Sequence, residues 1–162
     1  MTELALPQID RTTVSKKSLI VSQLKKFTNE ENVLSENEEI KPYETDGLAA
    51  YKQTPLAVVL PENTKEVSEI LKFCNEENIK VIPRGAGTGL SGGALPLQDA
   101  ILLGLGKFNK ILEIDFDNKC VVTQPGVTNL GITHAVQHKG YYYAPDPSSQ
   151  LACSIGGNVA EN

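Results

Sequence analysis

Residues 83–96 read PRGAGTGLSGGALP and are the most glycine-rich part of the chain. Five glycines fall within the nine positions from 85 to 93, although each would weaken a helix or strand by about 0.5–1 kcal/mol. Glycine lets a ligand approach bare backbone, and a run of exposed N–H groups forms a concave site for phosphate oxygens. The stretch therefore predicts a phosphate-binding loop. A flexible linker is disfavoured because a linker has neither flanking strands nor an embedded arginine.

Two other phosphate-binding motifs compete for the same loop. A P-loop requires Gly-Lys-Ser or Gly-Lys-Thr, and this loop contains no lysine. The Rossmann fingerprint G-x-G-x-x-G is formally met by Gly87, Gly89 and Gly92, with Glu113 about 20 residues further on. In that fingerprint the last glycine lies in a helix, whereas here another glycine and a proline interrupt the segment. A NAD-type Rossmann domain is kept as the alternative interpretation.

The residues before the loop predict a strand, a helix and a second strand. Residues 56–60 are a short apolar run of strand type that Pro61 ends. Asn63 is expected to cap a helix, and Glu66 to complete a reciprocal capping box with it. The apolar pair at 81–82 then leads directly into the loop. This order of elements makes a βαβ unit.

The residues after the loop predict further strands and a third helix. Residues 100–103 are apolar, and residues 111–114 and 120–123 flank a polar turn, which is the pattern of a β-hairpin. A helix is expected from Thr128 to about residue 138, with Gly140 ending it. The predicted fold class is α+β, or mixed α/β, with helices on a sheet that has both parallel and antiparallel pairs.

The chain is interpreted as two parts. Residues 1–52 read as an N-terminal helical arm, whose helix is expected to be capped by Ser18, followed by an irregular connector. Residues 53–162 carry the motifs. The hydrophobic content of 40% and charged content of 22% are ordinary for a soluble globular protein. A chain of 162 residues is about the size of one domain.

Composition argues against several classes of function. A net charge of −5 and the lack of a basic stripe make nucleic-acid binding unexpected. No run approaches the roughly 18 apolar residues of a membrane span, and no leader pattern is visible, so the expected location is cytoplasmic. The cysteines at 74, 120 and 153 are predicted to be buried thiols. His134 and His138 lack a third ligand nearby, so no metal site is predicted.

A second motif lies near the end of the chain and has two halves. Prolines at 145 and 147 fix an extended backbone around Asp146 and present the serines that follow as donors. Ser154 is predicted to cap a short helix whose first turn contains two glycines. Such a helix start exposes N–H groups to an anionic ligand.

Taken together, the two motifs resemble the FAD-binding domain of the vanillyl-alcohol oxidase and p-cresol methylhydroxylase flavoproteins. Within that superfamily they are similar to FAD-linked 2-hydroxy-acid oxidoreductases, the group that contains the flavin-bearing D subunits of bacterial glycolate oxidases and D-lactate dehydrogenases. Residues 43–48 and 55–61 fit the same group. The resemblance implies a p-cresol methylhydroxylase-type FAD-binding domain that is incomplete at its C-terminus. The substrate cap and the catalytic residues would lie beyond Asn162, so no catalytic residue is predicted.

The resemblance also implies how FAD is bound. Residues 84–92 would wrap the diphosphate, mainly through backbone N–H groups, and the second motif would run along the diphosphate and ribityl chain. Residues 124–126 would border the same groove. Some relatives tether the flavin through a histidine, but Thr88 occupies about that position here, so the FAD is expected to be non-covalent. The predicted FAD-binding residues are Pro83, Arg84, Gly85, Ala86, Gly87, Thr88, Gly89, Leu90, Ser91, Gly92, Gly126, Pro145, Asp146, Pro147, Ser148, Ser149, Ser154, Ile155, Gly156, Gly157, Asn158 and Ala160.

The activity implied for the complete protein is oxidation of a 2-hydroxy acid such as glycolate or D-lactate. Hydride would pass from the α-carbon to the flavin, and electrons would continue to a partner subunit or carrier. Contact with a membrane, if made, would be through partner subunits. The 162 residues alone are expected to lack turnover. A non-catalytic binding module is the remaining alternative.

Overall fold

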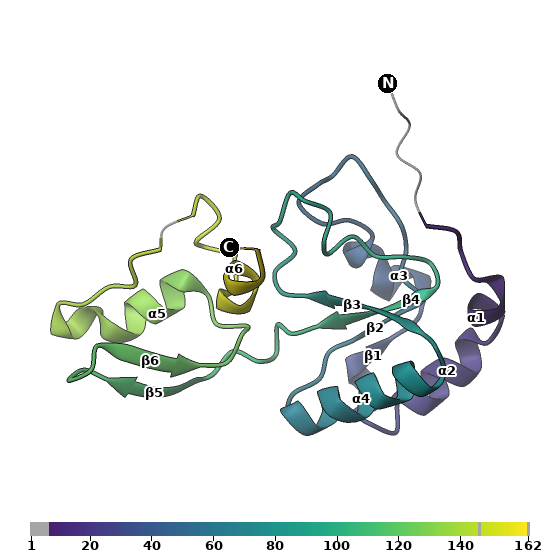
Figure 1. Ribbon diagram of the computed structural model, residues 1–162, viewed down its shortest axis with the longest axis horizontal. Helices are drawn as coiled ribbons and strands as arrows, with labels where there is room; N and C mark the ends of the chain where they lie inside the picture. Colours follow the sequence, from purple (N-terminus) through teal and green to yellow (C-terminus); the bar gives the residue numbers. More distant parts are fainter. Residues whose placement is uncertain (1–6, 146, 162) are drawn as a thin grey trace.

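The computed structural model describes residues 7–145 and 147–161. The chain forms two lobes, shown in Figure 1, of which the larger holds a four-stranded sheet and the smaller a two-stranded sheet. The last helix, α6 (Ile155–Glu161), lies where the two lobes meet. Within the described residues, no helix is long and apolar enough to cross a bilayer.

The larger lobe is built on a sheet with the strand order β1-β2-β4-β3. The strands are β1 (Val33–Leu34), β2 (Ala57–Val59), β3 (Lys80–Arg84) and β4 (Ala100–Gly104). β1 runs antiparallel to β2, and the other neighbours are parallel. The mixed sheet confirms the predicted fold class. It also shows that β4 lies between the two strands of the predicted βαβ unit, so that these two strands are not hydrogen-bonded to each other.

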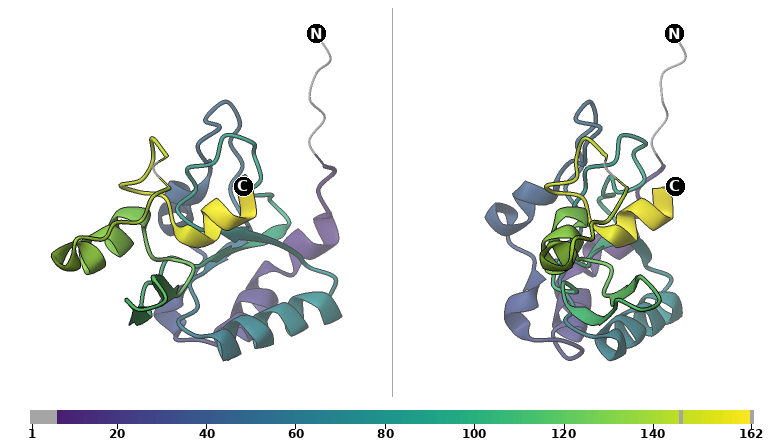
Figure 2. Two further views of the ribbon diagram at one scale, coloured as in Figure 1. Left: turned by 60° about the vertical axis from the view of Figure 1, so that its left-hand side comes forward. Right: turned by 90° about the vertical axis from the view of Figure 1, so that its left-hand side faces the viewer.

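Helices cover both faces of this sheet (Figure 2). The helices of this lobe are α1 (Arg11–Ser15), α2 (Lys17–Leu24), α3 (Asn37–Ile40) and α4 (Thr64–Glu76), with the 3-10 helices η1 (Glu30–Asn32) and η2 (Lys41–Tyr43). Side chains of α2 and α4 contribute to one core cluster, and α3 and η2 contribute to a separate one. The sheet is therefore the middle layer of three.

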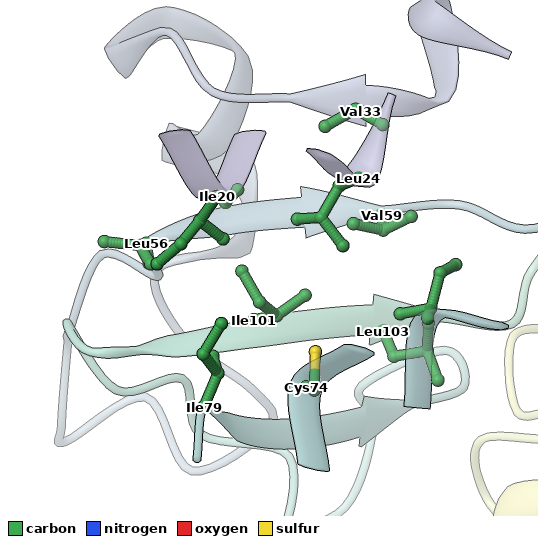
Figure 3. Packing of buried hydrophobic residues seen from close by; sticks show 11 residues of the cluster. Ile20, Leu24, Val33, Leu56, Val59, Cys74, Ile79, Ile101 and Leu103 are labelled. Carbon is green, nitrogen blue, oxygen red and sulfur yellow. The ribbon is translucent and has the colours of Figure 1, made fainter. Parts of the chain in front are cut away.

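The two clusters follow from the alternation of side chains along the central strands. Ile101 of β4 packs in the first cluster with Ile20 and Leu24 of α2, as Figure 3 shows. Its neighbour Leu102 belongs to the second cluster, with Ile40 of α3. All five residues of β4 are buried, as expected for a parallel strand covered on both faces.

The N-terminal segment is tied to the sheet by a buried carboxylate. Asp99 is only 2% exposed, and its Oδ2 accepts hydrogen bonds from the backbone N–H of Asp10 and from Nζ of Lys80, each at 2.7 Å. Burial alone would raise the pKa of Asp99, but the bonds from Asp10 and Lys80 outweigh it and lower that pKa. The ionised form is therefore the one that the fold stabilises.

Asp99→Asn is expected to lower the free energy of unfolding at pH 7 by about 1–3 kcal/mol, because it weakens two charge-assisted bonds. Since the folded-state pKa is the lowered one, the stabilisation is complete above the ordinary carboxyl pKa and disappears as the pH falls through the folded value. Urea unfolding at pH 7 and below about pH 4 measures the difference. Asp117→Asn, at an exposed residue of the hairpin turn, is the control. An equal loss of unfolding free energy at both pH values would contradict the assignment of the stabilisation to the ionised Asp99 carboxylate.

The structure agrees only in part with the predicted helix starts and with the predicted burial of the cysteines. Asn63 accepts from the Glu66 N–H at 3.0 Å as predicted. The Glu66 carboxylate accepts from the Glu62 N–H, the Thr28 hydroxyl and the Asn63 side-chain amide, and not from the Asn63 backbone N–H that would close the box. α2 begins at Lys17 rather than after a Ser18 cap, because α1 runs directly into it. The predicted burial of Cys120 is wrong, since this thiol starts a strand beside the exposed hairpin turn; the other two cysteines are buried.

The smaller lobe consists of a hairpin and a helix. The hairpin pairs β5 (Ile111–Asp115) with β6 (Cys120–Thr123), as predicted. Thr128 caps α5 (Asn129–Val136) by accepting from the Gly131 N–H at 3.0 Å. η3 (Gln137–Lys139) follows, and Gly140 ends it with a left-handed φ of 79°. An isolated bridge between Thr128 and Ser154 ties the start of α6 to this lobe.

Candidate functional site

A cavity of about 440 Å³ lies where the glycine-rich loop faces the start of α6. One wall is formed by residues 83–89, which are the end of β3 and the first part of the glycine-rich loop. The other wall contains Pro125, Ser149, Ser154 and residues 156–158. The two motifs that the sequence analysis singled out separately are therefore brought together around one cavity.

The loop presents backbone donors that the rest of the described chain leaves free. Among the described residues, no N–H group of residues 85–94 donates a hydrogen bond. Backbone donors that lack a protein partner need solvent or a ligand to satisfy them. Gly87 has a φ of +71° and Gly92 a φ of +76°, which residues with a side chain rarely adopt. The glycine spacing thus has the conformational use that the sequence predicted.

The Ser154 side chain lies close to Gly85 in the wall of the cavity. A Cβ added at Gly85 would collide with the Ser154 Oγ and would lie 4.0 Å from the N atom of Gly157. Ser154 is 5% exposed, and its Oγ has no hydrogen-bond partner within the described residues. The N–H of Gly157 likewise donates no hydrogen bond to any described residue. A buried hydroxyl and a backbone donor therefore converge beside the loop without protein partners.

The start of α6 is held in place by backbone hydrogen bonds. The N–H of Ile155 donates to the carbonyl of Val127, and that of Gly156 to the carbonyl of Pro125, each at 2.8 Å. A Cβ at Gly156 would approach the Pro125 Cβ to 2.5 Å. Gly156 therefore permits close packing, and Gly157 keeps the free donor. Ser154 sits at the predicted cap position, but its hydroxyl points toward Gly85 instead of capping the helix.

Several predicted site residues do not line the cavity. Leu90 is 72% exposed, and Ser91 donates to Oε2 of Glu161 at 3.4 Å. Gly92 faces Leu48, whose Cδ2 would be 3.5 Å from an added Cβ. Eight predicted residues that the structure describes are absent from the lining: Leu90, Ser91, Gly92, Gly126, Pro145, Pro147, Ser148 and Ile155.

Three of these residues have other surroundings. A Cβ at Gly126 would come within 2.6 Å of the carbonyl oxygens of Leu105 and Phe108. The carbonyl of Pro145 accepts from Asn129 Nδ2 at 3.2 Å. Ile155 lines a separate cavity between the hairpin and α5. Asp146 lies outside the described residues.

Pro125, which the resemblance places at the border of the groove, lines the cavity. The cavity also includes residues that the sequence analysis did not predict: Gly93, Ala94, Leu105, Cys153 and Glu161. Gly93 and Ala94 belong to the quoted loop, and Cys153 adjoins a predicted residue, so adjacency was an available signal. Leu105 follows β4 and reaches the cavity only because β4 pairs with β3. No pattern in the sequence indicates that placement.

The arrangement suits binding of an anion rather than acid–base chemistry. Free N–H groups and a hydroxyl surround a concave space, which is the geometry that holds phosphate oxygens. Within the described residues, no three His, Cys, Asp or Glu side chains are grouped closely enough to hold a metal ion. His138 packs edge-on against Phe116, with 5.9 Å between the ring centroids.

The loop is not followed by the helix that a Rossmann domain needs. Residues 85–99 contain no helix, and the chain passes directly into β4. In the NAD-type motif the pyrophosphate lies at the N-terminus of a helix that begins within the glycine fingerprint. The NAD-type alternative therefore lacks its principal structural feature.

Comparison with known proteins agrees with this geometry. The sequence profile of a family described as FAD binding domain matches residues 55–162. The chain is 51% identical over 98% of its length to glycolate oxidase subunit GlcD of Escherichia coli K12, and 41% identical over 88% to GlcD of Bacillus subtilis. It is 41% identical over 72% of its length to D-lactate dehydrogenase of Anaerostipes hadrus.

The chain spans about 30% of the length of the two glycolate oxidase subunits and 25% of that of the D-lactate dehydrogenase. Among solved structures, p-cresol methylhydroxylase with bound substrate superposes with a TM-score of 0.77. That match has 24% sequence identity and covers 96% of this chain and 31% of the other, so it bears on the fold alone. The chain therefore belongs to the FAD-binding domain family, in the fold of the p-cresol methylhydroxylase type.

Proposed function

We propose that this chain forms the diphosphate-binding part of the FAD site in a flavoprotein that oxidises a 2-hydroxy acid. The observation that carries the proposal is the group of unpartnered donors around the cavity: the loop N–H groups, the Gly157 N–H and the Ser154 Oγ. A diphosphate offers several acceptor oxygens and carries negative charge, so it satisfies more than one such donor at once.

The residues present fit this cofactor. The space beside Gly85 is one that a single Cβ would fill, as expected where a ligand approaches bare backbone. The proposed contacts are the predicted residues that line the cavity, namely residues 83–89, Ser149, Ser154, residues 156–158 and Ala160. The other predicted residues are retained as proposed contacts of lower priority, since cavity lining does not support them.

The relatives support the proposed class of reaction. Glycolate and D-lactate, which appear in the names of the matched proteins, are both 2-hydroxy acids. Bound FAD supplies the two-electron redox chemistry, and the residues of this chain hold and orient it. The substrate is then a small 2-hydroxy acid, and electrons leave to a partner subunit or carrier. A cytoplasmic location, with membrane contact through partners, belongs to the same proposal.

The flavin is proposed to be bound without a covalent link. Thr88 lines the cavity. A covalent histidyl–flavin bond requires an imidazole nitrogen, and threonine has none. Acid precipitation of the FAD-loaded, full-length protein is then expected to leave the flavin in the supernatant. Flavin retained in the precipitate would contradict this part of the proposal.

Ser154→Ala separates cofactor binding from folding. The Ser154 Oγ has no hydrogen-bond partner to lose among the described residues, so the free energy of unfolding of the apoprotein is expected to change by less than about 0.5 kcal/mol. Loss of a charge-assisted bond to phosphate is expected to weaken FAD affinity about 10-fold. Titration of the full-length protein with FAD, followed by flavin fluorescence, measures the dissociation constant.

The exposed Ser22→Ala, on α2, is the matched control and should bind FAD as the wild type does. Parallel titration with NAD tests the competing cofactor. Binding of NAD but not FAD by the wild type would overturn the proposed function. An unchanged FAD affinity in Ser154→Ala would remove the hydroxyl from the proposed contacts.

The division of the chain is also a proposal. We propose that residues 1–52 form an arm and connector and that the FAD-binding domain begins at residue 53. The family profile starts its match at residue 55, which supports this boundary. The arm nevertheless contributes β1 to the sheet and the side chains of Ile20 and Leu24 to the core. Deletion of the arm should therefore expose apolar surface, which binding of a hydrophobic dye would report.

A further inference from the structure

A short segment ahead of the matched family region packs directly against the glycine-rich loop. Residues 43–48, here called the brace, join η2 to the stretch that leads into β2. We propose that the brace positions the glycine-rich loop and so sets the affinity for FAD, an inference that rests on the proposed function. The family profile begins only at residue 55, so the brace adds residues outside that match to the cofactor site.

The first contact is between Gly47 and two carbonyl groups of the loop. A Cβ at Gly47 would come within 2.6 Å of the carbonyl oxygens of both Thr88 and Gly89. Asp46 shapes the bend, because its Oδ1 accepts from the N–H of Leu48 at 2.9 Å. The carbonyl oxygens belong to the backbone, so they cannot move aside without moving the loop.

Contact at these carbonyls also orients backbone donors. The peptide bonds of the described residues are all trans, and a trans peptide points its N–H opposite to its C=O within one rigid plane. The Thr88 carbonyl shares its peptide plane with the Gly89 N–H, and the Gly89 carbonyl shares its plane with the Leu90 N–H. Because both carbonyl oxygens face Gly47, both N–H groups point away from the brace. Both N–H groups are among the free donors of the loop.

The second contact runs through Arg84. Its Nη1 donates to the carbonyl of Tyr43 at 3.1 Å, and its guanidinium carbon lies 5.8 Å from the centroid of the Tyr43 ring. On the other side, a Cβ at Gly87 would come within 2.5 Å of the Arg84 Nε and Nη2. The guanidinium is thus a spacer between Tyr43 and the left-handed turn at Gly87.

The charge of Asp46 contributes to holding this spacer. Asp46 is 6% exposed, and its Oδ2 has no hydrogen-bond partner in the described part of the chain. Burial lowers the pKa of Arg84, and the negative charge of Asp46 opposes that effect. The side chain of Leu48 adds a third contact, against Gly92. The brace therefore reaches the loop at its start, middle and end.

Gly47→Ala in the full-length protein tests the first contact. The added methyl group must displace the loop carbonyls, so the FAD dissociation constant is expected to rise at least about 10-fold as loop donors lose their alignment. Gly106→Ala is the matched control, because a Cβ there meets nothing within 4 Å. Flavin fluorescence gives the dissociation constant, and thermal melting of the apoprotein shows whether each variant folds.

A pair of substitutions at Tyr43 tests the second contact independently. Arg84 contacts the ring face and the backbone carbonyl of Tyr43, and neither needs the phenolic hydroxyl. Tyr43→Phe is expected to keep wild-type FAD affinity, whereas Tyr43→Ala is expected to weaken it about 5-fold or more through the lost cation–π contact and looser loop. Rescue by phenylalanine separates this positioning role from a hydroxyl contact.

The outcomes distinguish this inference from the proposed function. Failure of the wild-type protein to bind FAD would overturn the proposed function. Wild-type binding together with unchanged affinity in folded Gly47→Ala and Tyr43→Ala would overturn only the role of the brace. If Gly47→Ala does not fold, the Tyr43 pair decides: weaker binding in alanine with rescue in phenylalanine supports the brace, and equal affinities refute it.

Discussion

Gly85→Val is expected to weaken FAD binding by the full-length protein at least about 100-fold, a loss of roughly 2.7 kcal/mol. The Cβ alone would collide with the Ser154 Oγ, and the branched methyl groups would occupy the space next to the Gly157 N–H. Ser154 cannot retreat easily, because the next two residues donate hydrogen bonds to the Val127 and Pro125 carbonyls. The valine must therefore displace the loop and cover the donors assigned to the diphosphate.

The dissociation constant from a FAD titration measures this effect, and melting of the apoprotein separates it from misfolding. Gly106→Val is the control, since a Cβ at Gly106 projects into open space and a glycine is replaced in both variants. A ligand that binds only the native state raises its melting temperature, so FAD should stabilise the control and not Gly85→Val. Affinities of the two variants within threefold of each other would contradict the assignment of the cavity.

Leu102→Ala is expected to lower the free energy of unfolding by about 3–5 kcal/mol. Leu102 is fully buried in the central strand β4 and packs with Val58 of β2 and Ile40 of α3. Truncation removes apolar burial and leaves a cavity that neighbouring backbone in the sheet cannot close, which is the costly case for leucine. Urea unfolding followed by circular dichroism measures the change in midpoint.

Leu19→Ala is the matched control for this prediction. Leu19 lies on α2 and is 60% exposed, so the same truncation should change the free energy of unfolding by less than about 0.5 kcal/mol. A loss below about 1 kcal/mol for Leu102→Ala would mean that the sheet is not the stability core of the larger lobe.

Local signals in the sequence predicted local structure well. The helix caps at Asn63 and Thr128 and the turn glycine at Gly140 were all predictable, because each depends on residues within a few positions. The hairpin of β5 and β6 has the same basis. The capping box at Glu66 is one place where the local rule failed, because the carboxylate accepts from the hydroxyl of the distant Thr28 as well as from the Glu62 N–H and the Asn63 side-chain amide.

The order of the strands could not be predicted from the same signals. The predicted βαβ unit has the right elements, but β4 enters between β2 and β3. Residues 56–60, 81–82 and 100–103 are all apolar, so hydrophobic pattern alone does not say which strand takes the centre. Burial on both faces decides it: the inner strands β2 and β4 are buried at every position, whereas no residue of the edge strand β3 is fully buried.

The sequence by itself determined that a glycine-rich loop of bare donors follows a strand and that a second glycine-containing motif lies near residue 157, because glycine content and capping residues act locally. The tertiary structure alone decided that Ser154 faces Gly85, that Leu105 reaches the cavity and that Gly47 presses on the loop carbonyls. These pairs are far apart along the chain, and their contact depends on how the sheet and the two lobes pack. Packing is a property of the whole chain, so no short motif encodes it.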